Sequence, residues 1–197
     1  MSYRSSRSRV ILAVAVLGLL VHAAGCDDAT APGSAGFDRP ANLPDVVQRD
    51  PVRILSADQD AQVTFRLSAA AAHPGEAVEF EAGAVNLRDE PLEFYGLVCW
   101  PDSPRFFLVD GQGTEYRIEW RPVPPCPASL KHLPPGETAT SRDWFSGFAL
   151  LDDVPVDLPF GDYTARAEFT YRPVPAPGTG TSTVIAETPF RWEATAN

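Results

Sequence analysis

Short runs in which apolar and polar residues alternate recur between residues 62 and 193. Val63, Phe65 and Leu67 alternate with polar neighbours, and a second run begins at Val78 and continues to Asn86. Alternation with period two turns one face of a strand towards a core and the other towards water. These runs predict β-strands, and no window shows the 3.6-residue period of an amphipathic helix.

Turn-forming residues separate the runs. Asp110-Gly111 lies between a run that ends at Val109 and the alternating residues Tyr116, Ile118 and Trp120, which predicts a hairpin. Further turns are expected at 73–76, 88–91, 133–137 and 158–162. This spacing predicts an all-β fold, an antiparallel β-sandwich of about seven to nine strands.

The first 25 residues have a different character. Arg4, Arg7 and Arg9 precede an unbroken apolar run at 10–21, and small residues at 23–25 precede Cys26. A basic segment, a short apolar segment and a small-residue cleavage site are typical of a secretory signal. A permanent membrane span needs about 20 apolar residues, so a cleaved signal is favoured over a transmembrane helix.

The sequence Ala23-Ala24-Gly25-Cys26 resembles the bacterial lipobox. This resemblance implies that Cys26 becomes the acylated first residue of the mature protein, anchored by its lipid to a bacterial membrane on the extracytoplasmic side of the cell envelope. The alternative is ordinary signal cleavage with Cys26 as a bystander. The sequence leaves open whether the membrane is the inner or the outer one.

Residues 26–51 are rich in Pro, Ala, Gly and Asp and show no periodicity, which predicts a flexible linker before a domain at 52–197. The full chain carries a net charge of −10, and removal of residues 1–25 would remove three arginines and no acid. Such a chain repels phosphate backbones, so a nucleic-acid partner is not expected.

The chain contains three cysteines, Cys26, Cys99 and Cys126. An odd number in an exported protein needs an explanation, and acylation of Cys26 supplies one. Cys99 and Cys126 then remain as a pair in an oxidising compartment, where disulfides persist. We therefore expect a disulfide between them.

The residues that support catalysis are sparse. The mature chain has two histidines, His73 and His132, both beside proline-containing turns, and neither lies in a recognisable catalytic motif. A group of acids, Asp152, Asp153, Asp157 and Asp162, does not follow a calcium-loop spacing and is expected to be solvated. No enzyme activity, cofactor or metal is expected.

Aromatic residues are more frequent in this sequence than histidines. Most belong to the expected core, but Trp100, Phe145 and Phe148 lie nearest to expected loops. Exposed aromatic side chains offer apolar contact area to a partner. These three residues are the candidates for a binding patch.

Several turn motifs occur in a recognisable order: Val85-Asn86 before Pro91-Leu92-x-Phe94, Phe107-x-Val109-Asp110, Leu133-x-Pro135-Gly136-Glu137, and Leu158-Pro159-x-Gly161-x-Tyr163. Their order over about residues 62–170 resembles the intracellular proteinase inhibitor (BsuPI-type) domain. The resemblance implies an immunoglobulin-like sandwich.

The sequence favours a membrane-anchored, non-catalytic interaction module with a protein partner in the cell envelope. The BsuPI-type resemblance adds protease inhibition as one alternative. A structural envelope lipoprotein is the other.

Overall fold

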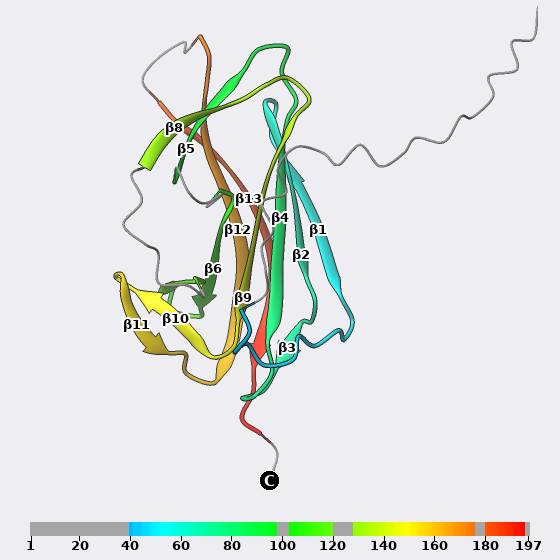
Figure 1. Ribbon diagram of the computed structural model, residues 1–197, viewed down its shortest axis with the longest axis vertical. Coiled ribbons are helices and arrows are strands. Elements are labelled where there is room, and N and C mark those ends of the chain that lie inside the picture. Colours follow the sequence, from blue (N-terminus) through cyan, green and yellow to red (C-terminus); the bar gives the residue numbers. More distant parts are fainter. Residues whose placement is uncertain (1–39, 98–102, 120–127, 176–179, 196–197) are drawn as a thin grey trace, which may run out of the picture. The chain divides into compact units, whose positions relative to one another are not determined.

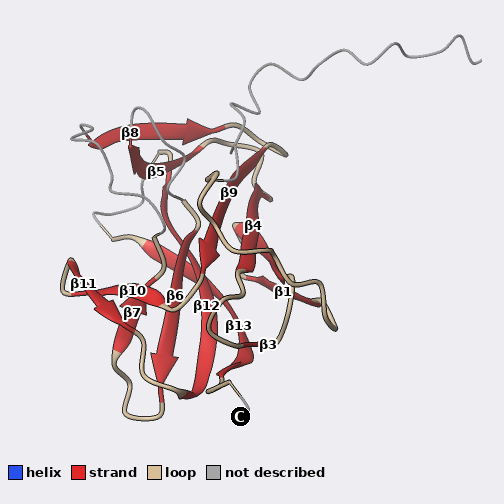
Figure 2. Ribbon diagram, turned by 60° about the horizontal axis from the view of Figure 1, so that its bottom comes forward, coloured by secondary structure: helices blue, strands red, loops and turns tan. Residues whose placement is uncertain are grey.

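The computed structural model describes residues 40–97, 103–119, 128–175 and 180–195, and Figure 2 shows this part of the chain as strands and loops. The strands are β1 (Val52–Ala57), β2 (Ala61–Leu67), β3 (Ala71–Ala72), β4 (Val78–Asn86), β5 (Leu92–Leu97), β6 (Arg105–Asp110), β7 (Glu115–Arg117), β8 (Ala128–Leu133), β9 (Thr138–Phe145), β10 (Phe148–Leu151), β11 (Val154–Asp157), β12 (Gly161–Pro173) and β13 (Ser182–Trp192). The predicted all-β class is confirmed. Within these ranges, no helix is long and apolar enough to cross a membrane.

The strands form two sheets that pack face to face (Figure 1). One sheet has the order β1-β2-β4-β9. The other has the order β11-β10-β7-β6-β12-β13-β3, and β5 joins it through β12 and carries β8 on its other side. All of these pairings are antiparallel except β13 with β3. The predicted antiparallel sandwich is therefore confirmed.

The core lies between the inner faces of the two sheets. Strand β4 alternates between buried and half-buried residues over its whole length, as its sequence pattern predicts. Phe65 of β2 stacks on Phe106 of β6 with ring centroids 5.9 Å apart, and Phe80 of β4 meets Phe190 of β13 edge to face at 6.3 Å. These ring pairs join the sheets.

The turn before β12 is fixed by a side chain. The Tyr163 hydroxyl donates a hydrogen bond to the Pro159 carbonyl at 2.6 Å, four residues upstream. A tyrosine that closes a corner in this way occurs in immunoglobulin-type sandwiches. The Leu158–Tyr163 motif thus stabilises the corner at which the chain enters β12.

The described chain has 13 strands, more than the seven to nine expected. One source of the difference is the hairpin β10–β11, which turns at Asp152 and Asp153 with φ of 50° and 63°. Two positive φ angles define a type I′ turn, for which Asn-Gly and Asp-Gly are the usual sequence signals. Asp-Asp adopts it here without that signal, so the sequence pattern missed this hairpin.

Part of the expected linker packs on the domain. Leu43 is buried, and the Val47 amide donates to the Ala77 carbonyl at 2.9 Å while the Ala77 amide donates to Asp45. The Arg49 amide likewise donates to the Ser68 carbonyl at 3.1 Å. The packed chain therefore begins by residue 40. The remainder of the linker and the signal, residues 1–39, lie outside the described residues, so their assignment stays a prediction.

Candidate binding surface

The structure separates the three residues expected to form an apolar patch. Phe148, the first residue of β10, is 58% exposed, as a contact residue must be. Phe145 is fully buried, so its assignment to an exposed patch is wrong. Trp100 lies outside the described residues, as do the lipidation candidate Cys26 and the disulfide candidates Cys99 and Cys126.

Phe145 is buried because its side chain lies on the inner face of β9, in the core between the sheets. On the inner face, Phe145 contacts Trp192 and Phe190 edge to face, with centroids 5.0 and 5.7 Å away. On the outer face, Trp144 packs with Leu43 and Ala77. The cover over Trp144 comes from the segment that the sequence had assigned to the linker.

A second exposed aromatic residue, Phe160, lies near the same buried tryptophan. Phe160 is 56% exposed, and its ring stacks on that of Trp192 with centroids 5.9 Å apart and an interplanar angle of 26°. Gly147, which precedes Phe148, also packs on the Trp192 ring. A Cβ atom added to Gly147 would lie 3.0 Å from Cζ2 of Trp192. Phe148 and Phe160 thus project from two segments that both pack on Trp192, and we call them the aromatic pair.

The backbone around the aromatic pair is held in place. The Leu158 amide donates to the Gly147 carbonyl at 2.8 Å, which continues the β10–β11 ladder towards Phe160. The corner hydrogen bond of Tyr163 fixes the other side of the same turn. Because these segments are already ordered, binding of a partner there costs this chain little additional conformational entropy.

Charged residues lie next to the aromatic pair in the strand pairing and along the chain. Asp157 is the cross-strand partner of Phe148. Asp162 accepts a hydrogen bond from Arg191 at 2.6 Å, and Arg191 also lies 3.6 Å from Glu193. The Asp162 side chain is 78% exposed, more than that of its partner Arg191. The apolar centre therefore has a rim in which acids outnumber bases.

Each histidine lies near a carboxylate. His73 Nε2 faces Glu193 at 3.5 Å, and His132 Nδ1 faces Glu93 at 3.9 Å.

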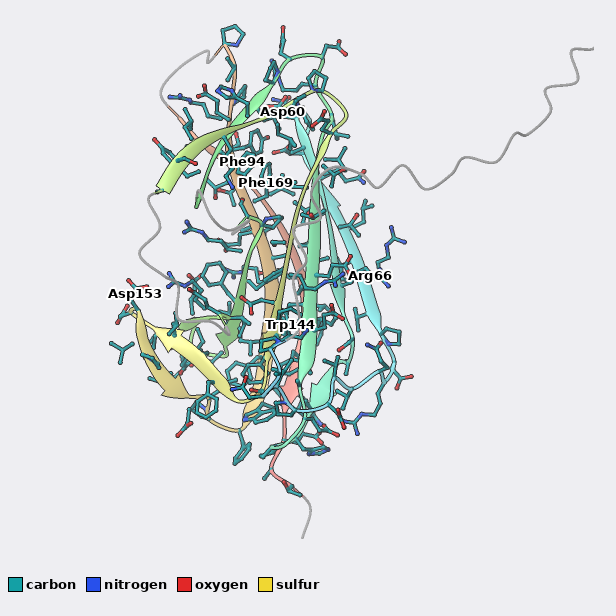
Figure 3. The ribbon with its side chains drawn as sticks, in the orientation of Figure 1. Asp60, Arg66, Phe94, Trp144, Asp153 and Phe169 are labelled. Carbon is teal, nitrogen blue, oxygen red and sulfur yellow. The ribbon has the colours of Figure 1, made fainter. Side chains whose placement is uncertain are left out.

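The acids considered as calcium ligands are dispersed. Asp153, labelled in Figure 3, lies at the tip of the β10–β11 hairpin and pairs with Arg117 at 2.8 Å, whereas Asp162 pairs with Arg191. Among the described residues, no group of three or more His, Cys, Asp or Glu side chains is placed to hold a metal ion.

Two titratable groups with shifted pKa values, Tyr163 and Asp110, support turns. Burial raises the pKa of Tyr163 to about 12, with smaller contributions from Tyr116 and Asp110. The Asp110 carboxylate accepts hydrogen bonds from the Thr114 and Gln112 amides, and the bond from Thr114 is the main cause of its lowered pKa. This carboxylate closes the predicted β6–β7 hairpin, which is confirmed.

A polar cluster near the β1–β2 turn also has a structural role. Asp60, labelled in Figure 3, is buried and accepts a hydrogen bond from Arg88 at 2.9 Å. The buried Tyr171 hydroxyl donates to Asp58 at 2.6 Å, and burial is the main cause of the raised pKa of Tyr171. Sequence patterns gave no signal for this cluster, because it joins the β1–β2 turn to Arg88 and to Tyr171 of β12, which are distant in the chain.

No protein-family model matches the chain, and no curated protein matches it. Among solved structures, the chain is similar to the X-ray structure of the Northeast Structural Genomics Consortium target SoR45, with a TM-score of 0.34 and 8% identity over 72% of this chain and 81% of that one. It is also similar to the putative ApaA protein from Bordetella pertussis, with a TM-score of 0.34 and 13% identity over 75% of this chain and 97% of that one. Likenesses at these TM-scores support no inference about function.

Proposed function

We propose that this chain is an exported, lipid-anchored binding module that recognises a protein of the bacterial cell envelope by contact, without catalysing a reaction. The observation that carries the proposal is the aromatic pair. Phe148 and Phe160 each expose more than half of their surface, yet their backbone segments pack on the buried Trp192. Exposed aromatic residues on an ordered support are typical anchors of protein interfaces.

The rim specifies the partner further. An apolar centre bordered by Asp157, Asp162 and Glu193 fits a partner that presents an apolar side chain with lysines or arginines around it. Rim charges act mainly on the association rate and on the choice of partner, whereas the buried centre supplies most of the affinity.

The proposed anchor and linker suit this function. Several acyl chains on Cys26 would hold the module at the membrane, because each buried methylene contributes about 0.8 kcal/mol. A tether of this kind raises the effective concentration of the module near other envelope proteins.

Site-specific photo-crosslinking tests the proposal in living bacteria. A photo-reactive benzoylphenylalanine replaces Phe148 in one full-length variant and Leu55 in the control. Leu55 is also 58% exposed but lies on β1 in the other sheet. We expect a discrete crosslinked product from position 148 and none from position 55. A Phe160→Ala substitution should reduce the product at least fivefold.

Two results would replace the proposal. Stoichiometric inhibition of a serine protease by the purified full chain, lost on substitution of Phe148, would establish protease inhibition at this surface. Equal crosslinking from positions 148 and 55 would remove the assignment of the aromatic pair, and a purely structural envelope role would then be favoured.

A further inference from the structure

The free edges of the two sheets differ in how well they are protected. Unpaired strand edges readily pair with another chain, and natural proteins cover, shorten or interrupt them. Strand β1 lies against β13 where the two sheets meet. Strand β9 is flanked by Pro104, whose carbonyl accepts a hydrogen bond from the buried Ser141 hydroxyl. Strand β11 has four residues, one of which is Pro155.

Strand β8 differs from these edges in the part of the chain that the structure describes. It runs for six residues, lacks proline and, among the described strands, pairs only with β5, although it carries Lys131, and charge is a further protection of an edge. Strands β5 and β8 lie at the upper end of the domain in Figure 1, away from the β10–β11 hairpin that carries the aromatic pair. The edge of β8 is therefore distinct from the proposed binding surface.

The outer face of β5 and β8 carries an exposed apolar pair. Tyr95 and Leu130 are cross-strand partners, and both are exposed. On the inner face of β5, Phe94 is buried and packs on Phe169 with ring centroids 5.5 Å apart (Figure 3). The exposed pair reaches the edge of the sheet at Leu130.

We propose that β8 pairs with β8 of a second copy of this chain, forming a two-fold symmetric dimer with one continuous sheet. A two-fold axis perpendicular to the sheet keeps the outer faces of both copies on the same side. Residues that face each other must then come from the same face, so Leu130 meets Leu130 of the partner subunit on the axis. Tyr95, Leu130 and their two symmetry mates form an apolar row across four strands.

The charges of β8 favour this register. Lys131 faces Ser129 of the partner subunit, and His132 faces Ala128 of the partner subunit, so no cationic side chain directly opposes its own copy. Moving the axis by one residue to Lys131 places this residue opposite Lys131 of the partner subunit, and like charges directly opposite in a sheet are destabilising. The sequence of β8 is thus self-complementary about Leu130.

The dimer is expected to be weak in solution. Pairing of residues 128–132 from each copy buries far less than the roughly 1,200 Å² typical of stable interfaces. Anchoring on a common membrane would favour it, because confinement raises the effective concentration of the two copies. The pairing is independent of the proposed function, since it uses neither Phe148 nor Phe160.

Disulfide trapping tests the register directly. Residues that face each other in antiparallel strands have Cα atoms about 4.5–5.5 Å apart, within the usual disulfide range of about 4.4–6.8 Å. The full chain with Leu130→Cys should form a covalent dimer of twice the chain mass when intact cells are treated with a mild oxidant. The matched control is Ile185→Cys on β13, because Ile185 is 40% exposed and Leu130 is 42% exposed. The wild-type chain gives the baseline for its own cysteines.

Sedimentation of the full chain in detergent provides a second measurement. The average mass of the wild type should rise with protein concentration, whereas Leu130→Asp should remain monomeric because it places two carboxylates across the axis. Ile185→Asp should associate like the wild type. Circular dichroism confirms that each variant is folded.

Three outcomes would overturn the proposal. Cross-linking of Leu130→Cys no stronger than that of Ile185→Cys would exclude the β8 register. A product with a mass other than twice that of the chain would assign the edge to a different protein. Equal association of the wild type and Leu130→Asp would show that any dimer forms elsewhere.

Discussion

Leu97 and Ala128 are cross-strand partners at the end of the antiparallel pair β5–β8. Every partner pair from Leu92–Leu133 to Leu97–Ala128 follows one register without a bulge. Cys99 and Cys126 lie outside the described residues, so their disulfide stays a prediction.

The disulfide should be present in exported protein and should stabilise the domain. On the chain-entropy model, closing a loop of about 28 residues contributes roughly 3–4 kcal/mol. We expect non-reducing mass spectrometry to find one Cys99–Cys126 bridge. The double variant Cys99→Ser/Cys126→Ser should melt at a lower temperature than the wild type, and a reducing agent should affect only the wild type. Two free thiols in exported wild-type protein would contradict the prediction.

Asn86 is a buried connection between two turns, and its loss should be costly. The Asn86 side-chain NH2 group donates to the Glu90 and Leu133 carbonyls at 2.9 and 2.8 Å. The side-chain carbonyl, Oδ1, accepts a hydrogen bond from the Arg88 amide. Asn86→Ala leaves these buried backbone groups without partners, so we expect a loss of about 2–4 kcal/mol in the free energy of unfolding, measured by urea titration.

The control for Asn86 is an exposed hydrogen bond, that between the Thr170 and Thr183 hydroxyls. Thr170→Ala should change the free energy of unfolding by less than about 0.5 kcal/mol, because water replaces the lost partner. Similar losses for both variants would show that the Asn86 contacts contribute little.

The strands that the sequence identified correctly are those with one buried and one solvated face, such as β2, β4 and β12. Their period-two pattern depends only on local burial. The pattern failed where tertiary contacts change the surroundings. The end of β9 shows this, since Leu43 covers Trp144 on one face while Phe145 is buried on the other. Phe145 is covered by Phe190 and Trp192 of β13, and no local pattern reports these contacts, so the exposure of Phe148 was anticipated and the burial of Phe145 was not.

The aromatic pair illustrates the same limit. Phe148 was selected because it follows an expected loop, whereas Phe160 lay within a turn motif and was assigned no role. The signal that could have revealed Phe160 is its position inside Leu158-Pro159-Phe160-Gly161, where a large apolar residue occupies the exposed position of a tight turn. Phe160 stacks on Trp192, which lies 32 positions further along the sequence, so this contact could be recognised only from the structure.

The corner hydrogen bond of Tyr163 should be measurable as stability. Tyr163→Phe removes the donor to the Pro159 carbonyl, and we expect the free energy of unfolding at pH 7 to fall by about 1–2 kcal/mol. Tyr95→Phe is the matched control, because the Tyr95 ring is exposed and should be insensitive to loss of its hydroxyl. Equal effects of the two substitutions would contradict a specific role for the corner.

The same tyrosine should contribute to the alkaline limit of stability. The pKa of Tyr163 is raised from 10.0 to about 12 in the folded chain, chiefly by burial. The folded state therefore retains the phenol proton more tightly than the unfolded state. The stabilisation is complete below pH 10 and is lost as the pH rises towards 12. Denaturant titrations between pH 8 and 12 should show that the wild type loses its advantage over Tyr163→Phe in this window.

Lipidation of Cys26 is the prediction on which the proposed location depends. The order of basic segment, apolar segment, small residues and cysteine predicts processing before Cys26 and acylation of its thiol and new amino terminus. The full chain expressed in a bacterium should incorporate labelled fatty acid and sediment with membranes. Cys26→Ser should lose the label, whereas Cys99→Ser/Cys126→Ser should keep it, because those cysteines follow no lipobox. A wild-type chain that is unlabelled and free of membranes would show that Cys26 is not the anchor, and the module would then have to reach its partner without a tether.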